Sequence, residues 1–249
     1  MKFFALTFAL SWASWVASFR FQQPALYYLG VFAPAIVALA LDGTAPLQRI
    51  FRPDVGARWY LFAISYVAAV KLAVAVIHRV ALGAWPRFGD EAWYLIAGAI
   101  IISTPVQAGE ELGWRGYALP RLAARFGMAR ASLLLGVVWA LWHLPFFFLP
   151  GTDKTGQSIT VYTLQVTALS VAMAWLYVQA KGSLLLMMLM HSAGNQTKDI
   201  VPSVGQPVVA WLTVGLLWVC AVWFMARLPA WRPSPAALAG DSSPAVPSR

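Results

Sequence analysis

Residues 92–117 read AWYLIAGAIIISTPVQAGEELGWRGY, which places two adjacent carboxylates, Glu110 and Glu111, at the end of an apolar run long enough to enter a membrane. An ionised side chain at bilayer depth costs about 3 kcal/mol on insertion scales, so intramembrane acids usually have a function. On a helix, Glu111 and Arg115 lie four residues apart on one face and can neutralise each other. Glu110 faces away from them and is expected to have no partner. A carboxylate without a partner is a candidate general base.

The whole chain has the composition of an integral membrane protein. Of its 249 residues, 60% are hydrophobic and 11% are charged, against about 25% charged residues in soluble domains. The net charge of +9 comes from basic residues at the ends of apolar runs, with no nucleic-acid motif, so we expect no nucleic-acid partner. The single cysteine, Cys220, excludes an internal disulfide and lies in an apolar run.

Apolar runs long enough to cross a hydrocarbon core of about 30 Å recur along the chain. They predict an all-α fold, a polytopic integral membrane helical bundle with about eight transmembrane helices, in one domain over residues 1–228. The tail 229–249, rich in Pro, Ala and Ser, is expected to be disordered and cytoplasmic. The eight runs are 3–19, 26–41, 59–78, 92–112, 130–149, 159–178, 183–197 and 208–226.

The basic residues predict the orientation of these spans. With a cytoplasmic N-terminus, 12 of the 18 lysines and arginines fall in inside segments, five fall in outside segments, and Lys71 lies within a span. Lysine and arginine collect on the cytoplasmic side, so both termini are expected there. The composition, with more Arg than Lys and much Ala, suggests a bacterial chain, so the plasma (inner) membrane is the expected location. The segment Ala118 to Arg130 has helical spacing of leucines and arginines and is expected to form a short amphipathic helix on that face.

Other polar residues also fall inside apolar runs. His143 lies within the fifth run, while His191 and Asn195 lie four apart in the seventh. The third histidine, His78, is at a helix end and is expected to be structural. Lys71 is expected to extend its ammonium to the outer surface rather than to pair with an acid.

Taken singly, each intramembrane polar residue is more often an interhelical hydrogen bond of about 0.6 to 2 kcal/mol. Together, the acids, histidines and amide of three spans avoid a large desolvation cost only by converging on one hydrated cavity. The set suits hydrolysis, with Glu as the base for water, His to position that water or bind a metal, and His and Asn as donors to an oxyanion. A silent membrane scaffold and a proton-relaying transporter remain open alternatives.

At these residues the sequence resembles the CPBP intramembrane proteases, a family that includes type II CAAX prenyl endopeptidases and bacteriocin-processing, self-immunity or lysostaphin-resistance-type proteins. The family pattern is EExxxR, then an aromatic-xxx-His, then His-xxx-Asn, on successive membrane helices. Trp139 stands where the family usually has Phe. The resemblance covers about residues 92–197, and the matching residues are Glu110, Glu111 and Arg115, then Trp139 and His143, then His191 and Asn195.

The resemblance implies an intramembrane endopeptidase whose active site opens to the cytoplasmic side and whose partner is a membrane-associated peptide or protein substrate. It implies that Glu110 activates the water with His143, and that His191 and Asn195 stabilise the oxyanion. Supporting roles are implied for Glu111, Arg115 and Trp139. The alternative on the same fold is a catalytically silent scaffold or immunity partner.

The cofactor is left open by the sequence. Glu110, His143 and His191 are the candidate ligands if a divalent metal such as zinc is used, although the HExxH spacing is absent. A glutamate and histidine mechanism without a fixed metal is equally open.

The asymmetry of basic residues gives a testable topology. Cysteine labelling or reporter fusions should place the Ala118 to Arg130 segment and the tail after Pro229 on the cytoplasmic side. Labelling of either segment from outside intact cells would overturn the orientation.

Overall fold

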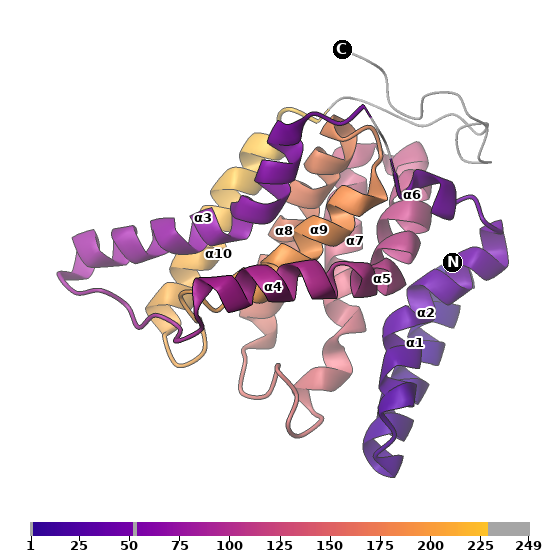
Figure 1. Cartoon of the computed structure of the whole chain (residues 1–249), viewed down its shortest axis with the longest axis horizontal. Coiled ribbons are helices and arrows are strands. Elements are labelled where there is room, and N and C mark those ends of the chain that lie inside the picture. The colour runs from indigo at the N-terminus through magenta and orange to yellow at the C-terminus, as the bar shows by residue number, and fades with distance from the viewer. Residues whose placement is uncertain (1, 52–53, 229–249) are drawn as a thin grey trace.

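The computed structural model describes residues 2–51 and 54–228, and every regular element in those residues is a helix (Figure 1). The predicted tail 229–249 lies outside the described residues. The helices are α1 (Lys2–Phe21), α2 (Pro24–Asp42), α3 (Ala57–Leu82), α4 (Trp93–Ser103), α5 (Ala108–Gly113), α6 (Leu119–Phe126), α7 (Met128–Trp142), α8 (Ile159–Gln179), α9 (Leu184–Thr197) and α10 (Pro207–Met225). The prediction of an all-helical fold is therefore confirmed.

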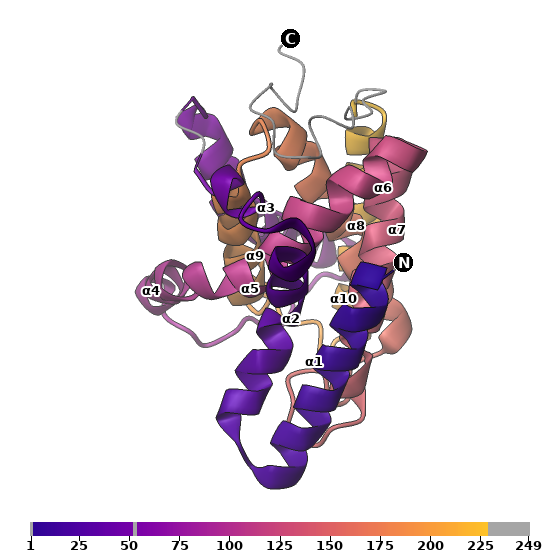
Figure 2. The ribbon, with the colours of Figure 1, turned by 90° about the vertical axis from the view of Figure 1, so that its right-hand side faces the viewer.

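The helices pack as neighbours in sequence and across it. α1 lies along α2, and α7 lies along α8, which also contacts α10; α3 contacts α9 and α10. Figure 2 shows the α1–α2 hairpin standing at one side of the bundle. Four helices among the described residues are long and apolar enough to cross a membrane, namely α2, α3, α8 and α10. A helical membrane protein is thus supported, whereas the number of about eight crossings stays a prediction.

The apolar run predicted as a single span over 92–112 is broken. α4 ends at Ser103, a 3-10 turn follows over Pro105–Gln107, and α5 begins at Ala108. Pro105 causes the break because proline has no N–H to donate to the preceding turn. In Figure 1, α4 and α5 lie across the bundle rather than along it, and Glu110 of α5 is buried.

The fifth run also differs from its prediction. α7 ends at Trp142, and a 3-10 turn over Leu144–Phe147 follows, so His143 caps the helix instead of lying inside a span. Pro145 explains the end of the helix, because proline disfavours helical geometry in the residue before it and removes a hydrogen-bond donor.

Two glycines set the position of α5. Gly109 and Gly113 are one turn apart and both face α2; a Cβ atom at Gly109 would lie 3.0 Å from the Phe32 ring. A Cβ at Gly113 would lie 2.5 Å from Cβ of Pro34 and 2.6 Å from its carbonyl group. Small residues four apart allow two membrane helices to approach closely. This contact turns Glu110 and Glu111 away from α2, toward the interior.

The segment Ala118 to Arg130 contains the predicted short amphipathic helix as α6, which ends at Phe126, so that Arg130 belongs to α7. Its place on the cytoplasmic face stays a prediction. Leu119 and Ala123 are buried, and α6 packs against α7, while Arg125 is exposed. Arg121 forms an ion pair of 2.6 Å with Asp42 at the end of α2. The helix is therefore held to the bundle by contacts as well as by its amphipathic character.

Because α5 lies close to α2, an alanine should lower stability at Gly113 but not at Gly98. Gly113→Ala should lower the melting temperature in detergent by several degrees, because overpacking against backbone atoms costs about 1 to 3 kcal/mol. Gly98→Ala in α4 is the matched control, because a Cβ there meets no atom within 4 Å. Equal melting temperatures for the two variants would contradict the packing described.

Candidate active site

Glu110 of α5 is buried, with 6% of its surface exposed. The indole Nε1–H of Trp139 donates a hydrogen bond of 2.7 Å to Glu110 Oε2. The expectation that Glu110 has no partner is therefore wrong, because the α5–α7 contact brings an aromatic donor to it. An indole is a neutral donor, and the ion pairs among the described residues do not include Glu110. The carboxylate is oriented without being neutralised.

Glu111 points from α5 toward α9 and accepts two hydrogen bonds on one oxygen. Arg115 Nη1 donates to Glu111 Oε1 at 2.9 Å, and His191 Nδ1 lies 2.8 Å from the same atom. The side chains of Glu111 and Arg115 are completely buried, and that of His191 is 4% exposed. The predicted pair of Glu111 with Arg115 is confirmed, and His191 joins it.

Arg115 also connects the two glutamates through Trp139. Its guanidinium carbon lies 4.3 Å from the centre of the Trp139 ring, whose indole N–H bonds Glu110. A guanidinium over an aromatic face is attractive, more so when both are removed from water. The Trp139 ring is thus fixed between the cation and the carboxylate, which defines the direction in which Glu110 points.

The hydrogen-bond partners of His143 and His191 indicate which nitrogen of each ring carries the proton. A carbonyl and an ionised carboxylate only accept, so Nδ1–H of His143 donates to the Trp139 carbonyl at 2.9 Å and Nδ1–H of His191 donates to Glu111. In the neutral form each ring then presents the lone pair of Nε2 as its remaining polar group. Such atoms accept protons or bind cations, and they donate to an oxyanion only when the ring is protonated.

One cavity of about 390 Å³ gathers most of the predicted site. Glu111 and Arg115 are not among its lining residues and lie behind the wall that Trp139 forms. Asn195 is one turn beyond His191 on α9, is exposed, and has no hydrogen bond within the part of the chain that the structure describes. The predicted residues that line the cavity are Glu110, Trp139, His143, His191 and Asn195.

The cavity side chains include possible metal ligands. A carboxylate and two histidine Nε2 atoms are suitable zinc ligands in kind. In residues 2–51 and 54–228, however, no group of three His, Cys, Asp or Glu side chains is close enough to share an ion. As arranged, the candidates Glu110, His143 and His191 do not fit a metal, and no catalytic step is derived through one.

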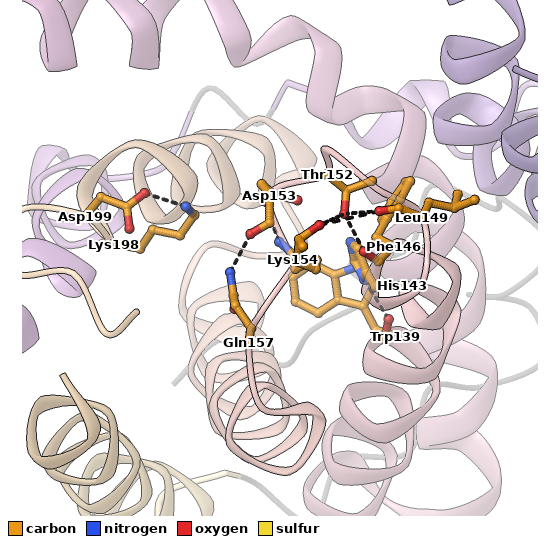
Figure 3. A network of polar contacts seen from close by, with 11 residues as sticks. Trp139, His143, Phe146, Leu149, Thr152, Asp153, Lys154, Gln157, Lys198 and Asp199 are labelled. Atoms are coloured by element: carbon orange, nitrogen blue, oxygen red, sulfur yellow. Dashed lines mark hydrogen bonds and ion pairs between the residues drawn. The ribbon is translucent and has the colours of Figure 1, made fainter. Parts of the chain in front are cut away.

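The sequence did not reveal that the loop 148–158 forms part of the same cavity. Figure 3 shows this loop beside Trp139 and His143, with Lys154 paired to Asp153 at 2.6 Å and Gln157 donating to the Asp153 carbonyl. Burial raises the pKa of Asp153, but the adjacent Lys154 lowers it further, so the pKa lies below its ordinary value. The Asp153 carboxyl is therefore ionised at neutral pH. No periodicity or motif in this loop indicates the role.

The exposed residues of the cavity lie at one end of the bundle. They belong to the start of α2, the loop 148–158, the end of α9 and the segment 198–204. No lining residue comes from α6 or from the segments 42–51 and 180–183, which occupy the opposite end (Figure 1). The predicted orientation puts the exposed end outside, whereas the resemblance implies access from the cytoplasm. The two expectations conflict, and the labelling experiment above separates them.

The fold and cavity define a class of protein, a helical membrane protein with buried carboxylates and histidines around an internal cavity. Residues 89–197 match the model of the family described as type II CAAX prenyl endopeptidase Rce1-like. The chain is also 26% identical over 226 residues to CAAX prenyl protease 2 of Methanococcus maripaludis, which covers 80% of this chain and 83% of that protein. The predicted resemblance to this family is therefore confirmed, with residues 89–197 as the matched segment.

The geometry predicts that Arg115→Ala lowers the stability of the protein and that Glu110→Gln does not. Arg115→Ala leaves Glu111 buried without its cation and should cost about 3 to 5 kcal/mol in the free energy of unfolding, seen as lost yield and a lower melting temperature. Glu110→Gln should keep a melting temperature close to that of the wild type, because the amide oxygen can still accept from Trp139.

Arg125→Ala on the exposed face of α6 controls for loss of an arginine alone. If Glu110→Gln is as unstable as Arg115→Ala, the distinction between a structural and a chemically available carboxylate fails.

Proposed function

We propose that this chain is an intramembrane endopeptidase that hydrolyses a peptide bond in a membrane-associated substrate. Its relative in Methanococcus maripaludis is named as a protease, CAAX prenyl protease 2. The observation that carries the proposal is the convergence of Glu110, His143, His191 and Asn195 on one cavity. A membrane-facing scaffold needs no such set, because each buried polar group adds a desolvation cost.

The proposed reaction begins with a water held at Glu110. The Glu110 carboxylate takes a proton as the water oxygen attacks the peptide carbonyl carbon, with His143 Nε2 accepting the second hydrogen bond of that water. The carbonyl oxygen becomes an oxyanion. Glu110 then returns its proton to the peptide nitrogen, the C–N bond breaks and the carbonyl reforms. The remaining requirement is a donor to the oxyanion.

Asn195 is the proposed donor to that oxyanion. Its side chain offers two N–H groups and has no other hydrogen bond within the described residues. His191 can share this role only as an imidazolium, because its neutral form with Nδ1–H on Glu111 has no proton on Nε2. Arg115 balances the charge of Glu111 beside this histidine.

The same proposal includes the arrangement in the membrane. We propose about eight crossings over residues 1–228, with residues 92–197 as the motif-bearing core, both termini cytoplasmic and the plasma (inner) membrane as the location. The break at Pro105 makes the fourth crossing discontinuous. Discontinuous helices at membrane depth occur where they border a cavity, which agrees with the place of Glu110.

Substitutions of the catalytic set should act on turnover. With a membrane-anchored peptide and purified protein, Glu110→Gln should abolish detectable cleavage, and Asn195→Ala should lower kcat by on the order of 100- to 1000-fold with little change in KM. His143→Ala should lower kcat, whereas His78→Ala, outside the cavity, is the matched control.

The outcome that contradicts proteolysis is equal function of wild type, Glu110→Gln and His143→Ala in cells. That result would favour the silent scaffold or immunity partner. Uptake of a solute coupled to protons, lost in Glu110→Gln, would favour the transporter. Metal content of the purified protein, with reversible loss of cleavage in a chelator, would show that the histidines rearrange to bind an ion.

A further inference from the structure

Lys71 of α3 is a buried cation in the wall of the same cavity. Only 3% of its surface is exposed, and its Nζ donates to Ser203 Oγ at 2.9 Å and to Thr213 Oγ1 at 3.4 Å. The expectation that it extends to the outer surface is wrong, because the segment carrying Ser203 and the start of α10 cover it. Its ammonium therefore faces protein and cavity instead of bulk water.

Lys71 has no ion-pair partner among the described residues, although Asp199 attracts its ammonium. Both hydrogen-bond partners are neutral hydroxyls, and no ion pair among the described residues includes Lys71. Asp199 lines the cavity too, but it is paired with Lys198 at 2.5 Å. An ammonium has three donors, so at least one remains for a ligand. A buried cation without an anion is costly, and a bound carboxylate removes that cost.

The position of Lys71 relates it to the candidate catalytic residues. Val67 precedes Lys71 by one turn on α3, and its Cγ2 lies 3.5 Å from where a Cβ of Gly194 would be. Gly194 adjoins Asn195 and is three residues from His191. Four residues of helix advance about 6 Å, so Lys71 lies about one turn beyond the level of Asn195. Lys71 and Glu110 line the same cavity, so one bound peptide can contact both.

We propose that Lys71 binds a carboxylate of the peptide substrate and so selects which peptides are cleaved. This inference rests on the proposed peptidase function. The carboxylate can come from the C-terminus of the peptide or from an Asp or Glu side chain near the scissile bond, and both have the same chemistry. Ser203 and Thr213 position the ammonium, and Asn195 and Glu110 act on the bond itself.

The test compares three forms of one lipid-anchored peptide that the purified protein cleaves: a free C-terminus with no acidic side chain, a C-terminal amide, and the amide with one Asp after the scissile bond. Wild type should cleave at least one carboxylate form with a kcat/KM about 10- to 100-fold above the plain amide, because a charge-assisted hydrogen bond is lost in the amide. The difference should lie mainly in KM. The form that is preferred identifies the source of the carboxylate.

Lys71→Met should lose the preference for carboxylate and cleave the three forms with similar kcat/KM, while Lys71→Arg should keep part of the preference. Arg125→Met is the control for loss of one basic side chain, because Arg125 is exposed on α6 and lies outside the cavity; it should keep the preference. Equal cleavage of all three peptides by wild type, an unchanged preference in Lys71→Met, or the same loss in Arg125→Met would each overturn the proposal.

A binding measurement separates this proposal from the peptidase function. Glu110→Gln should be stabilised against heat by acetyl-Ala-Val-Leu-Ala or acetyl-Ala-Asp-Leu-Ala amide more than by acetyl-Ala-Val-Leu-Ala amide, and adding Lys71→Met should remove the difference. If nothing is cleaved but this difference exists, the peptidase proposal fails and the carboxylate site stands. If cleavage occurs and no carboxylate form is preferred in either assay, the Lys71 proposal alone fails. The peptide comparison on wild type needs no variant to fold.

Discussion

The structure depends on the completely buried ion pair between Glu111 and Arg115. Its two ions come from one turn of chain and lie 2.9 Å apart, so the segment enters the bundle as a nearly neutral unit. Burial of separate charges would cost several kcal/mol each. With that pair in place, Glu111 can also hold His191, and Arg115 can hold the Trp139 ring. The positions of the cavity-lining groups follow from these contacts.

The sequence predicted what local spacing and desolvation determine. Glu111 and Arg115 are four residues apart, so their pairing follows from helix geometry alone. The convergence of Glu110, His143, His191 and Asn195 follows from the cost of burying polar groups separately, although their roles remain proposals. The break before α5 and the end of α7 both occur next to prolines, Pro105 and Pro145, so both interruptions have a cause in the local sequence.

Contacts between distant segments were not predictable in the same way. The bond from Trp139 to Glu110 joins residues 29 apart, and that from His191 to Glu111 joins residues 80 apart. The rotation of α5 that selects these partners is set by Gly109 and Gly113 against α2, which depends on shape rather than on hydrophobic period. The expectation for Lys71 was wrong because a lysine can extend its ammonium to the surface only where the path is open. The segment that carries Ser203 lies over that path and binds the ammonium instead.

Because α4 is short, it depends on the later helix α9 for its place in the bundle, and this dependence affects when the site can be completed during synthesis. Its 11 residues extend only about 16 Å, about half of a hydrocarbon core, so α4 has too little length to anchor itself across the bilayer. It is held by α9, where Ser103 and Ser192 are 2.6 Å apart and Ser192 donates to the Ile100 carbonyl. During synthesis, the neutral Glu111–Arg115 pair therefore enters the membrane before α9, which holds α4, has been made. The cavity gains His191 and Asn195 only after most of the chain has been translated, so an unfinished chain lacks the assembled site.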